Sequence, residues 1–346
     1  MVWAAFLLLV LFILAFDLGI FSRESKALSA RAALIRTTVY FVLALLFTVF
    51  VYFAYENHWG GLGIYAASPP GDETHPQSHR SSSDLPKNGW EAAAQFFMGY
   101  ILEQSLSIDN IFVIALILSY FQVPAAFQHR VLLWGILGAL VMRGVMISLG
   151  IALIESFSFT MYIFGALLLF TAFKMLFAGE GEVDFEKNYV IRLTRKVFRL
   201  HPSFVQDHFF VIVDGKRAMT PMFLALIIVE STDLVFAVDS IPAVIGLTQD
   251  PFLVFTSNVF AILGLRSLYF ALADLLGRFH FLKYSLVAIL AFVGIKMLLH
   301  DFLPHNQTGL ITIISLGFIA LVLGIGIGAS LIVPEKEHHS SEDDPA

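Results

Sequence analysis

Charged side chains lie inside stretches of this sequence that are otherwise apolar enough to cross a membrane, and nine of them are candidates for a functional role. Five are acidic and four are basic: Glu103, Asp109, Glu230, Asp233 and Asp239, with Arg143, Lys174, Arg266 and Lys296. A charge at the centre of a spanning helix costs about 2.5 to 3.5 kcal/mol on insertion scales. We therefore expect all nine to face the interior of a helix bundle, with the four bases acting as charge partners of the carboxylates.

Uncharged polar groups accompany two of the acids, in the pairs Asp109-Asn110 and Asp239-Ser240. Buried ion pairs that only pin helices together would explain the bases well, but they have no need of these extra groups. Oxygen ligands suit hard divalent cations such as Mg²⁺, Ca²⁺ and Mn²⁺, whereas Zn²⁺ and Cu⁺ prefer imidazole and sulfur. The chain has no cysteine and its histidines fall in loops or at span ends. Ligand type therefore favours Mn²⁺ over Zn²⁺.

Regular helices would not bring all these acids to one face. At about 100° per residue, Asp239 lies about 180° from Glu230 on an unbroken helix. Pro242 removes the hydrogen bond that its position would give to the carbonyl of Val238, so we expect a kink beside Asp239. Broken helices near the membrane midplane are the expected architecture for an ion site.

The elements that carry these residues are predicted to be nine membrane-spanning helices, because a span needs about 20 mostly apolar residues. The candidates are 2–21, 34–55, 91–120, 131–154, 160–178, 219–246, 252–275, 281–300 and 309–333. Composition agrees: the 346 residues are 58% hydrophobic and 14% charged, against roughly 25% charged in an ordinary soluble domain. These values exclude a soluble enzyme, and a net charge of −6 without a dense basic run gives no footprint for nucleic acid.

The positions of lysine and arginine predict the orientation, since cytoplasmic loops hold the excess of positive charge. If the loop after the first span is cytoplasmic, fifteen basic residues fall inside and two, Arg80 and Lys87, fall outside. We therefore expect a bacterial cytoplasmic membrane protein with its N-terminus outside and its C-terminus inside.

Two parts of the sequence resemble each other. YIFGALLLFTAFKML, residues 162–176, aligns without gaps to YSLVAILAFVGIKML, residues 284–298, and pairs Lys174 with Lys296. Upstream segments pair Arg143 with Arg266 and Asp109 with Asp239. Each unit contains three spans, and an odd-numbered unit repeated in tandem must enter the membrane from opposite sides. This predicts two inverted repeats with a site near the midplane.

The predicted fold class is thus an all-α polytopic membrane protein. We expect peripheral helices in 1–56, an external flexible loop in 57–90, the first repeat in 91–178, a cytoplasmic loop with a basic amphipathic helix in 179–217, the second repeat in 218–300, a last span in 308–333 and a disordered acidic tail in 334–346. Asp214-Gly215 lies between short apolar runs and predicts a hairpin in the cytoplasmic loop.

The segments GYILEQSLSIDNIFV, VESTDLVFAVDSIPA and SNVFAILGLRSLYF resemble the signature segments of the TerC/Alx family of bacterial integral membrane proteins, and within it the Alx branch. The similarity runs from about Trp3 to Ile332. The resemblance implies manganese efflux across the cytoplasmic membrane. It also implies that the ion ligands are Glu103, Asp109, Asn110, Glu230, Asp233, Asp239 and Ser240.

Two functions from different classes stay open. The first is a secondary transporter that exports Mn²⁺, with protons as the counter-ion. The second is a membrane scaffold or an assembly or stress factor, linked to tellurite resistance or redox modulation, that stabilises membrane-protein partners or a second copy of the chain. No phosphate-binding motif and no nucleophile–base pair accompanies the acids, so we expect neither an enzyme nor a bound cofactor. A divalent ion and the lipid bilayer are the expected partners.

Overall fold

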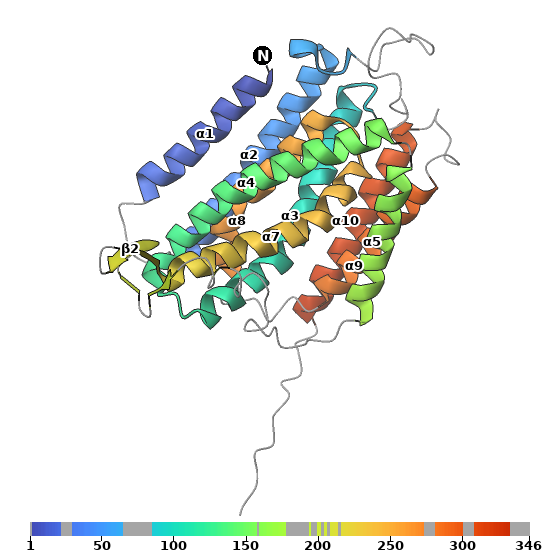
Figure 1. Cartoon of the computed structure of the whole chain (residues 1–346). Helices are drawn as coiled ribbons and strands as arrows, with labels where there is room; N and C mark the ends of the chain where they lie inside the picture. Colours follow the sequence, from blue (N-terminus) through green and yellow to red (C-terminus); the bar gives the residue numbers. More distant parts are fainter. Residues whose placement is uncertain are drawn as a thin grey trace, which may run out of the picture.

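The computed structural model describes residues 2–21, 30–64, 85–157, 159–177, 194, 199–201, 204–205, 208–213, 216–272, 281–299 and 308–332. Within these ranges the chain forms a bundle of α-helices, a short 3-10 helix (Trp59–Gly61) and three short strands (Figure 1). The helices are α1 (Val2–Phe21), α2 (Ala30–Glu56), α3 (Gly89–Tyr120), α4 (Ala125–Ser156), α5 (Thr160–Phe177), α7 (Pro221–Ile245), α8 (Pro251–Leu272), α9 (Leu282–Leu298) and α10 (Thr308–Ile332). Most of the predicted external loop and the acidic tail lie outside the described residues.

Each predicted span coincides with one helix. The largest difference is at α4, which begins at Ala125 rather than at residue 131. Six helices in the described ranges are long and apolar enough to cross a membrane: α2, α4, α5, α7, α8 and α10. The chain is therefore a multi-span helical protein, and the remaining helices α1, α3 and α9 complete the bundle.

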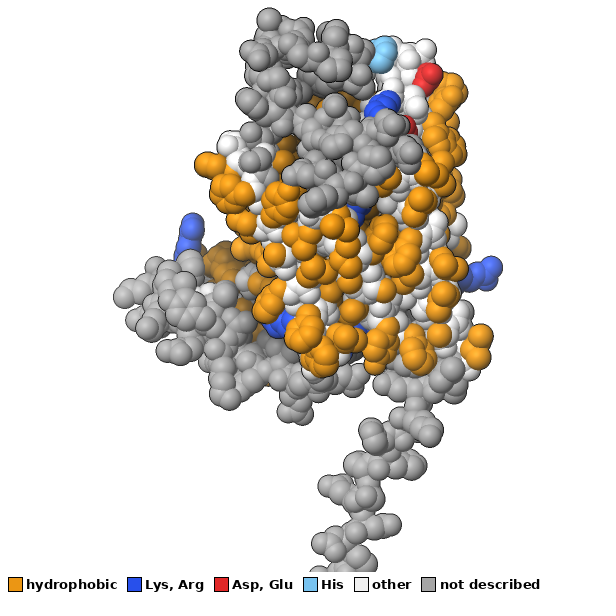
Figure 2. Space-filling view, turned by 90° about the vertical axis from the view of Figure 1, so that its right-hand side faces the viewer, with side chains coloured by type: hydrophobic (Ala, Val, Ile, Leu, Met, Phe, Trp, Pro, Cys, Tyr) orange, Lys and Arg blue, Asp and Glu red, His pale blue; other side chains and the backbone are white. Residues whose placement is uncertain are grey.

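Large hydrophobic side chains cover the outside of the bundle. Figure 2 shows them over the face that α5 and α10 form on the right of Figure 1. Phe170, Phe173 and Phe177 on α5 are exposed, as are Leu321 and Ile325 on α10. Contiguous apolar surface of this extent is unfavourable in water and matches lipid chains. The outer surface therefore agrees with the spans predicted from hydropathy.

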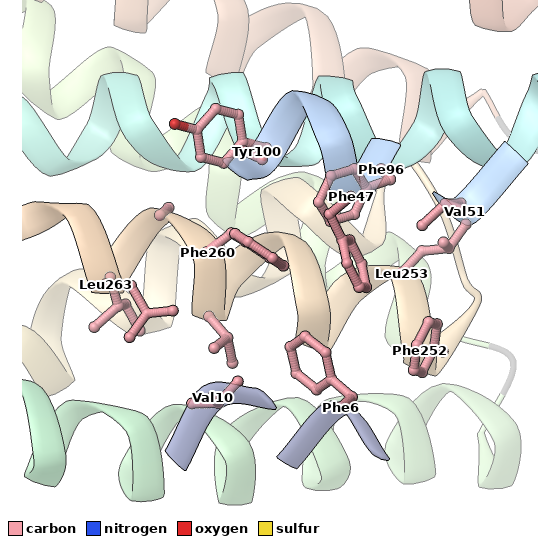
Figure 3. Close-up of a cluster of buried hydrophobic side chains, with 14 of the residues drawn as sticks. Phe6, Val10, Phe47, Val51, Phe96, Tyr100, Phe252, Leu253, Phe260 and Leu263 are labelled. Carbon is pink, nitrogen blue, oxygen red and sulfur yellow. The ribbon is translucent and has the colours of Figure 1, made fainter. Parts of the chain in front are cut away.

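Helix α8 is the centre of the bundle. In its most apolar stretch 89% of the residues are buried, compared with 17% in α2. It packs against α2, α3 and α4, and Figure 3 shows the aromatic side chains at this contact. The ring of Phe47 lies 4.7 Å from that of Phe260 and 5.1 Å from that of Phe96, centroid to centroid.

The helices of the two predicted repeats pack across each other in an exchanged pattern. Helix α3 packs on α8, α4 packs on α7, and α5 packs on α9. If α3, α4 and α5 are equivalent to α7, α8 and α9, the first two contacts are counterparts of each other and the third is its own counterpart. The units are therefore interlocked, and neither forms a separate core.

The closest approach between the units is at α5 and α9. A Cβ atom on Gly294 would lie 2.9 Å from the carbonyl oxygen of Gly165, and a Cβ on Gly165 would lie 3.0 Å from the carbonyl oxygen of Gly294. Small residues are the usual means by which membrane helices bring their backbones together.

Helices α3 and α7 each run without a break, so the broken helices expected near the midplane are not found in them, while the kink expected beside Asp239 stays a prediction. Helix α7 runs through Pro242 to Ile245, and the N–H of Gly246 donates to the carbonyl of Pro242 at 2.8 Å. Proline is tolerated inside membrane helices because neighbouring groups compensate for the lost bond. The carbonyl of Val238 still lacks its usual intrahelical donor, because proline has no N–H.

The segment between α5 and α7 contains a small sheet, which an all-α fold did not predict. Strands β2 (Phe210–Val213) and β3 (Lys216–Met219) pair antiparallel, which confirms the predicted hairpin. Strand β1 (Arg199–Leu200) pairs parallel to β3. The basic amphipathic helix, expected over residues 190–200 of this segment, lies mostly outside the described residues. Its end, Arg199 and Leu200, belongs to β1 instead. In Figure 1 this sheet and the N-terminus lie at opposite ends of the bundle.

The turn between α7 and α8 is buried and fixed by hydrogen bonds. Asp250 accepts bonds from the N–H groups of Phe252 at 2.9 Å and Leu253 at 3.2 Å, and so caps the start of α8. Thr248 donates its hydroxyl to Gln95 of α3 at 2.7 Å. These contacts anchor the central helix to α3 at one end of the bundle.

Candidate ion-binding site

Arg143 connects the charged residues at the centre of the bundle. Its side chain extends from α4 and is 2% exposed. The guanidinium Nη1 contacts the carboxylate of Glu103 on α3, which is completely buried. Nε and Nη2 donate to the two carboxylate oxygens of Asp233 on α7, at 3.1 Å and 2.8 Å. The pairing with Asp233 is therefore bidentate, which is the strong geometry for arginine and a carboxylate.

Asn258 on α8 completes this cluster. Its side-chain oxygen lies 3.4 Å from Nη1 of Arg143, and the residue is 1% exposed. Four helices thus contribute one residue each, and we name Glu103, Arg143, Asp233 and Asn258 the central cluster. Two carboxylates and one guanidinium leave one negative charge in excess. In a buried, low-dielectric place an uncompensated negative charge is costly.

The two carboxylates of the central cluster occupy equivalent positions in the two repeats. The alignment that pairs Asp109 with Asp239 also pairs Glu103 with Asp233 when it is continued toward the N-terminus. One guanidinium therefore joins corresponding acids of both units. The internal sequence alignment is enough to pair Glu103 with Asp233. That both contact the same arginine follows from the structure.

Several buried polar atoms on α3, α7 and α8 have no hydrogen-bond partner within the described part of the chain. On α3 they are Oε2 of Glu103, Oε1 of Gln104, Oγ of Ser107 and Nδ2 of Asn110; on α7 and α8 they are Oγ of Ser240 and Nδ2 of Asn258. Unpaired buried polar groups are rare and costly, so each requires an explanation. Four of these atoms are oxygens, the type of ligand that hard divalent cations prefer.

Glu230 approaches the central cluster from α7 but faces α4. Its carboxylate lies against Gly138, where an added Cβ would overlap it. A Cβ on Gly135, about one turn earlier in α4, would lie 4.0 Å from the nearer carboxylate oxygen. Two glycines on α4 therefore make room for this acid. Sequence reasoning identified Glu230 and did not identify the glycines that accommodate it.

Asp239 lies further along α7. Its Oδ1 accepts a hydrogen bond from the hydroxyl of Thr171 on α5 at 2.8 Å. Lys174, on the same helix as Thr171, interacts with this carboxylate electrostatically. Lys296 is held differently from its counterpart Lys174, since its ammonium donates to the carbonyl of Gly246 at 3.0 Å. Arg266 is buried on α8, 5% exposed.

The structure does not bring every candidate ligand together. Asp109 belongs to α3, but its side chain lies outside the described part of the chain. Asn110 and Ser240 are buried, 4% and 1% exposed. Among the described side chains no three of His, Asp or Glu converge as metal ligands do. Glu103 and Asp233 are engaged by Arg143, while Glu230 and Asp239 contact α4 and α5.

Two polar contacts were missed by sequence reasoning: Asn258 and Thr171. Asn258 ends the short polar run Thr256-Ser257-Asn258, and Thr171 stands alone among apolar neighbours. That signal is weak, because threonine often bonds only to its own helix, as Thr232 does to the carbonyl of Ile228 at 2.7 Å. Their roles follow only from which helices are neighbours.

Comparison with known proteins gives consistent matches. Residues 88–338 match the model of the "Integral membrane protein TerC family". A membrane protein of Myxococcus xanthus, STKORF319, is 39% identical over 343 residues, covering 99% of this chain and 96% of its own. The Escherichia coli protein described as "Putative membrane-bound redox modulator Alx" is 42% identical over 304 residues, covering 87% of each chain. No solved structure gives a significant match.

Proposed function

The chain belongs to the TerC family of integral membrane proteins, and on that premise we propose that it is a secondary transporter that exports Mn²⁺ across a bacterial cytoplasmic membrane. Its bacterial relatives and its multi-span helical fold are the basis for this location. The observation that carries the proposal is the central cluster, in which equivalent acids of two units meet in a buried place with one negative charge in excess.

Burial of so many charges is the main argument for transport over a purely structural role. A buried ion pair is weak evidence for stability, because desolvation offsets most of the Coulombic gain. Charged residues inside membrane bundles instead mark ion pathways. The unpartnered oxygens of Glu103, Ser107 and Ser240 add ligands that an ion pair does not use.

The architecture supports alternating access around this place. We propose that all nine helices cross the membrane and that α3–α5 and α7–α9 are inverted repeats, with the N-terminus outside. The exchanged packing of α3 on α8 and α4 on α7 is what a pseudo-twofold axis through the α5–α9 contact would produce. In transporters of this kind the substrate binds at the repeat interface, where the central cluster lies.

Manganese is the preferred ion because the candidate ligands are oxygens. The proposed set is Glu103, Asp109, Asn110, Glu230, Asp233, Asp239 and Ser240, with no sulfur or imidazole. Since these side chains are dispersed in the structure, binding requires α3 and α7 to move relative to α4. Protons are the proposed counter-ion, because carboxylates in a low dielectric take up protons when a cation leaves.

A role as redox modulator or scaffold is the second candidate, and the description of the Escherichia coli relative is what favours it. The chain has no cysteine, so thiol chemistry within the chain is excluded. Any redox effect would then act through metal content or through partner proteins. A scaffold would not depend on the charge of the acidic motifs.

Replacing the matched aspartates tests the proposal. Asp109→Asn and Asp239→Asn keep size and hydrogen-bonding capacity while removing the charge that a divalent ion needs. Each should abolish Mn²⁺ flux in proteoliposomes and manganese tolerance in cells, with membrane abundance near that of the wild type. Asp17→Asn in α1 is the control and should change flux much less. Wild-type Mn²⁺ flux in both Asn variants would contradict an ion-binding role of these aspartates and would favour the scaffold function.

A further inference from the structure

The guanidinium of Arg143 lies where a cation shared by the two repeats would lie. It uses Nη1 for Glu103 and uses Nε and Nη2 for Asp233. These two acids come from corresponding positions of the repeats and from different helices. A divalent ion that joined the repeats through these acids would need the same space and the same carboxylate oxygens.

We propose that Arg143 is a built-in competitor of the transported ion: it occupies Glu103 and Asp233 while no ion is bound, and it leaves them when an ion binds. This inference rests on the proposed function and adds how the ion is released. Arg143 is then a positioning residue that exchanges places with the ion. It is not an ion ligand, since a guanidinium has no lone pair for a metal.

Charge explains why the two states exclude each other. Two carboxylates neutralise one divalent ion, and they are left with one excess negative charge when the guanidinium alone is present. With both cations in place, the buried cluster would hold two positive groups side by side. Repulsion of this kind is strong where water does not screen it. Binding of the ion must therefore displace Arg143, and the return of Arg143 must favour release of the ion.

The hydrogen bonding of the cluster agrees with an exchangeable arrangement. A permanent buried ion pair is stable only when the remaining donors and acceptors are satisfied. Here Oε2 of Glu103 and Nδ2 of Asn258 have no hydrogen-bond partner among the described residues, although both residues are at most 1% exposed. Glu103 therefore keeps one carboxylate oxygen beside the guanidinium that is available to an incoming cation.

The side chain at position 143 determines how strongly it competes with the ion for Asp233. Arg143 binds Asp233 through two parallel bonds, which lysine cannot reproduce because its ammonium is a point charge. A lysine at this position would keep the charge but compete less well for the two carboxylates. An uncharged glutamine would not compete at all.

The test measures Mn²⁺ binding by calorimetry and Mn²⁺ flux in proteoliposomes for the full chain. The variants are Arg143→Gln and Arg143→Lys. The control is Arg130→Gln, which removes the same charge from the same helix where Arg130 stacks over Phe209 at 5.4 Å. We expect Arg143→Gln to bind Mn²⁺ at least tenfold more tightly and to transport it at least tenfold more slowly. Arg143→Lys should lie between, and the control should bind within about twofold of the wild type.

The outcomes separate this inference from the proposed function. If the wild type binds and transports Mn²⁺ while folded Arg143→Gln binds no more tightly, Arg143 is a structural charge and the inference is wrong. If the wild type neither binds nor transports Mn²⁺, the proposed function fails and the inference fails with it. Should Arg143→Gln not fold, Arg143→Lys decides: tighter binding supports exchange, and an unchanged dissociation constant overturns it.

Discussion

At the level of single residues, Gly138 controls the position of a candidate ligand. A Cβ on Gly138 would overlap the carboxylate of Glu230. That carboxylate is the end of a flexible side chain, so it can move aside without disturbing the backbone. We expect Gly138→Ala to leave stability within about 1 kcal/mol, because alanine also favours the helix by about that amount, while Mn²⁺ flux falls at least severalfold.

Gly317→Ala is the matched control for this change, because a Cβ at Gly317 in α10 would meet no described atom within 4 Å beyond its own helix backbone. It makes the same chemical change in a helix and should leave both stability and flux close to the wild type. Thermal unfolding in detergent and flux in proteoliposomes give the two readouts. Normal flux in Gly138→Ala would mean that the position of Glu230 is unimportant for transport.

The sequence was most informative at this scale for charged residues. Glu103, Arg143 and Asp233 could be selected because a charge in an apolar span is costly and needs a reason. Asn258 and Thr171 could not, since uncharged polar residues are common in helices and cost little. Which acid would meet which base also depends on the neighbours of each helix, and spacing along one helix does not contain that information.

At the level of helices, the α5–α9 contact depends on the absence of side chains. A Cβ on Gly294 would lie 2.9 Å from a backbone oxygen of Gly165 and 3.1 Å from Cγ of Leu169. Gly294→Ala should therefore push the helices apart and destabilise the protein by about 1 to 3 kcal/mol, as overpacking does. A lower midpoint of thermal unfolding in detergent would show this.

Gly324→Ala in α10 is the comparison variant. A Cβ built on Gly324 would meet no atom of the described residues within 4 Å, apart from its own helix backbone. It should leave the midpoint unchanged or slightly raised. Equal midpoints for the Gly294 and Gly324 variants would contradict a close α5–α9 contact.

Helix positions were predicted well because hydropathy reports them directly. Hydrophobic runs locate each span, and the ends are marked by charged or turn residues such as Asn88, which caps α3 through the N–H of Glu91 at 2.8 Å. The expectation of a broken helix was wrong because the effect of proline on a helix depends on its surroundings, while the kink at Pro242 stays a prediction. The small sheet was only half predicted: a turn signal indicates a hairpin, but β1 pairs with β3 from 19 residues away, Arg199 with Ala218.

At the level of the whole molecule, the orientation in the membrane is testable with single cysteines, because the native chain has none. Ser82→Cys lies in the loop predicted to be outside and Ser203→Cys in the loop predicted to be inside. An impermeant thiol reagent should label the first variant in intact cells and the second only after permeabilisation. Labelling of Ser203→Cys in intact cells would reverse the predicted orientation.

The family and the multi-span helical class were both predicted from sequence and are confirmed. The internal repeat was also visible in the sequence, because related helices keep related charged positions. The exchanged packing between the units was not, since self-similarity shows that two segments are alike and does not show which faces they share. The same limit explains why the acids were expected at one place, although Glu230 and Asp239 of α7 contact different helices, α4 and α5.

The burial of α8 has a consequence for biosynthesis. Its partners α2, α3 and α4 are translated first, so they leave the ribosome and enter the bilayer before the helix that joins them exists. During that interval Glu103 and Arg143 can already neutralise each other, because α3 and α4 are consecutive. Asn258 and the aromatic side chains around Phe260 arrive only later. The bundle therefore closes only when a late helix inserts among earlier ones.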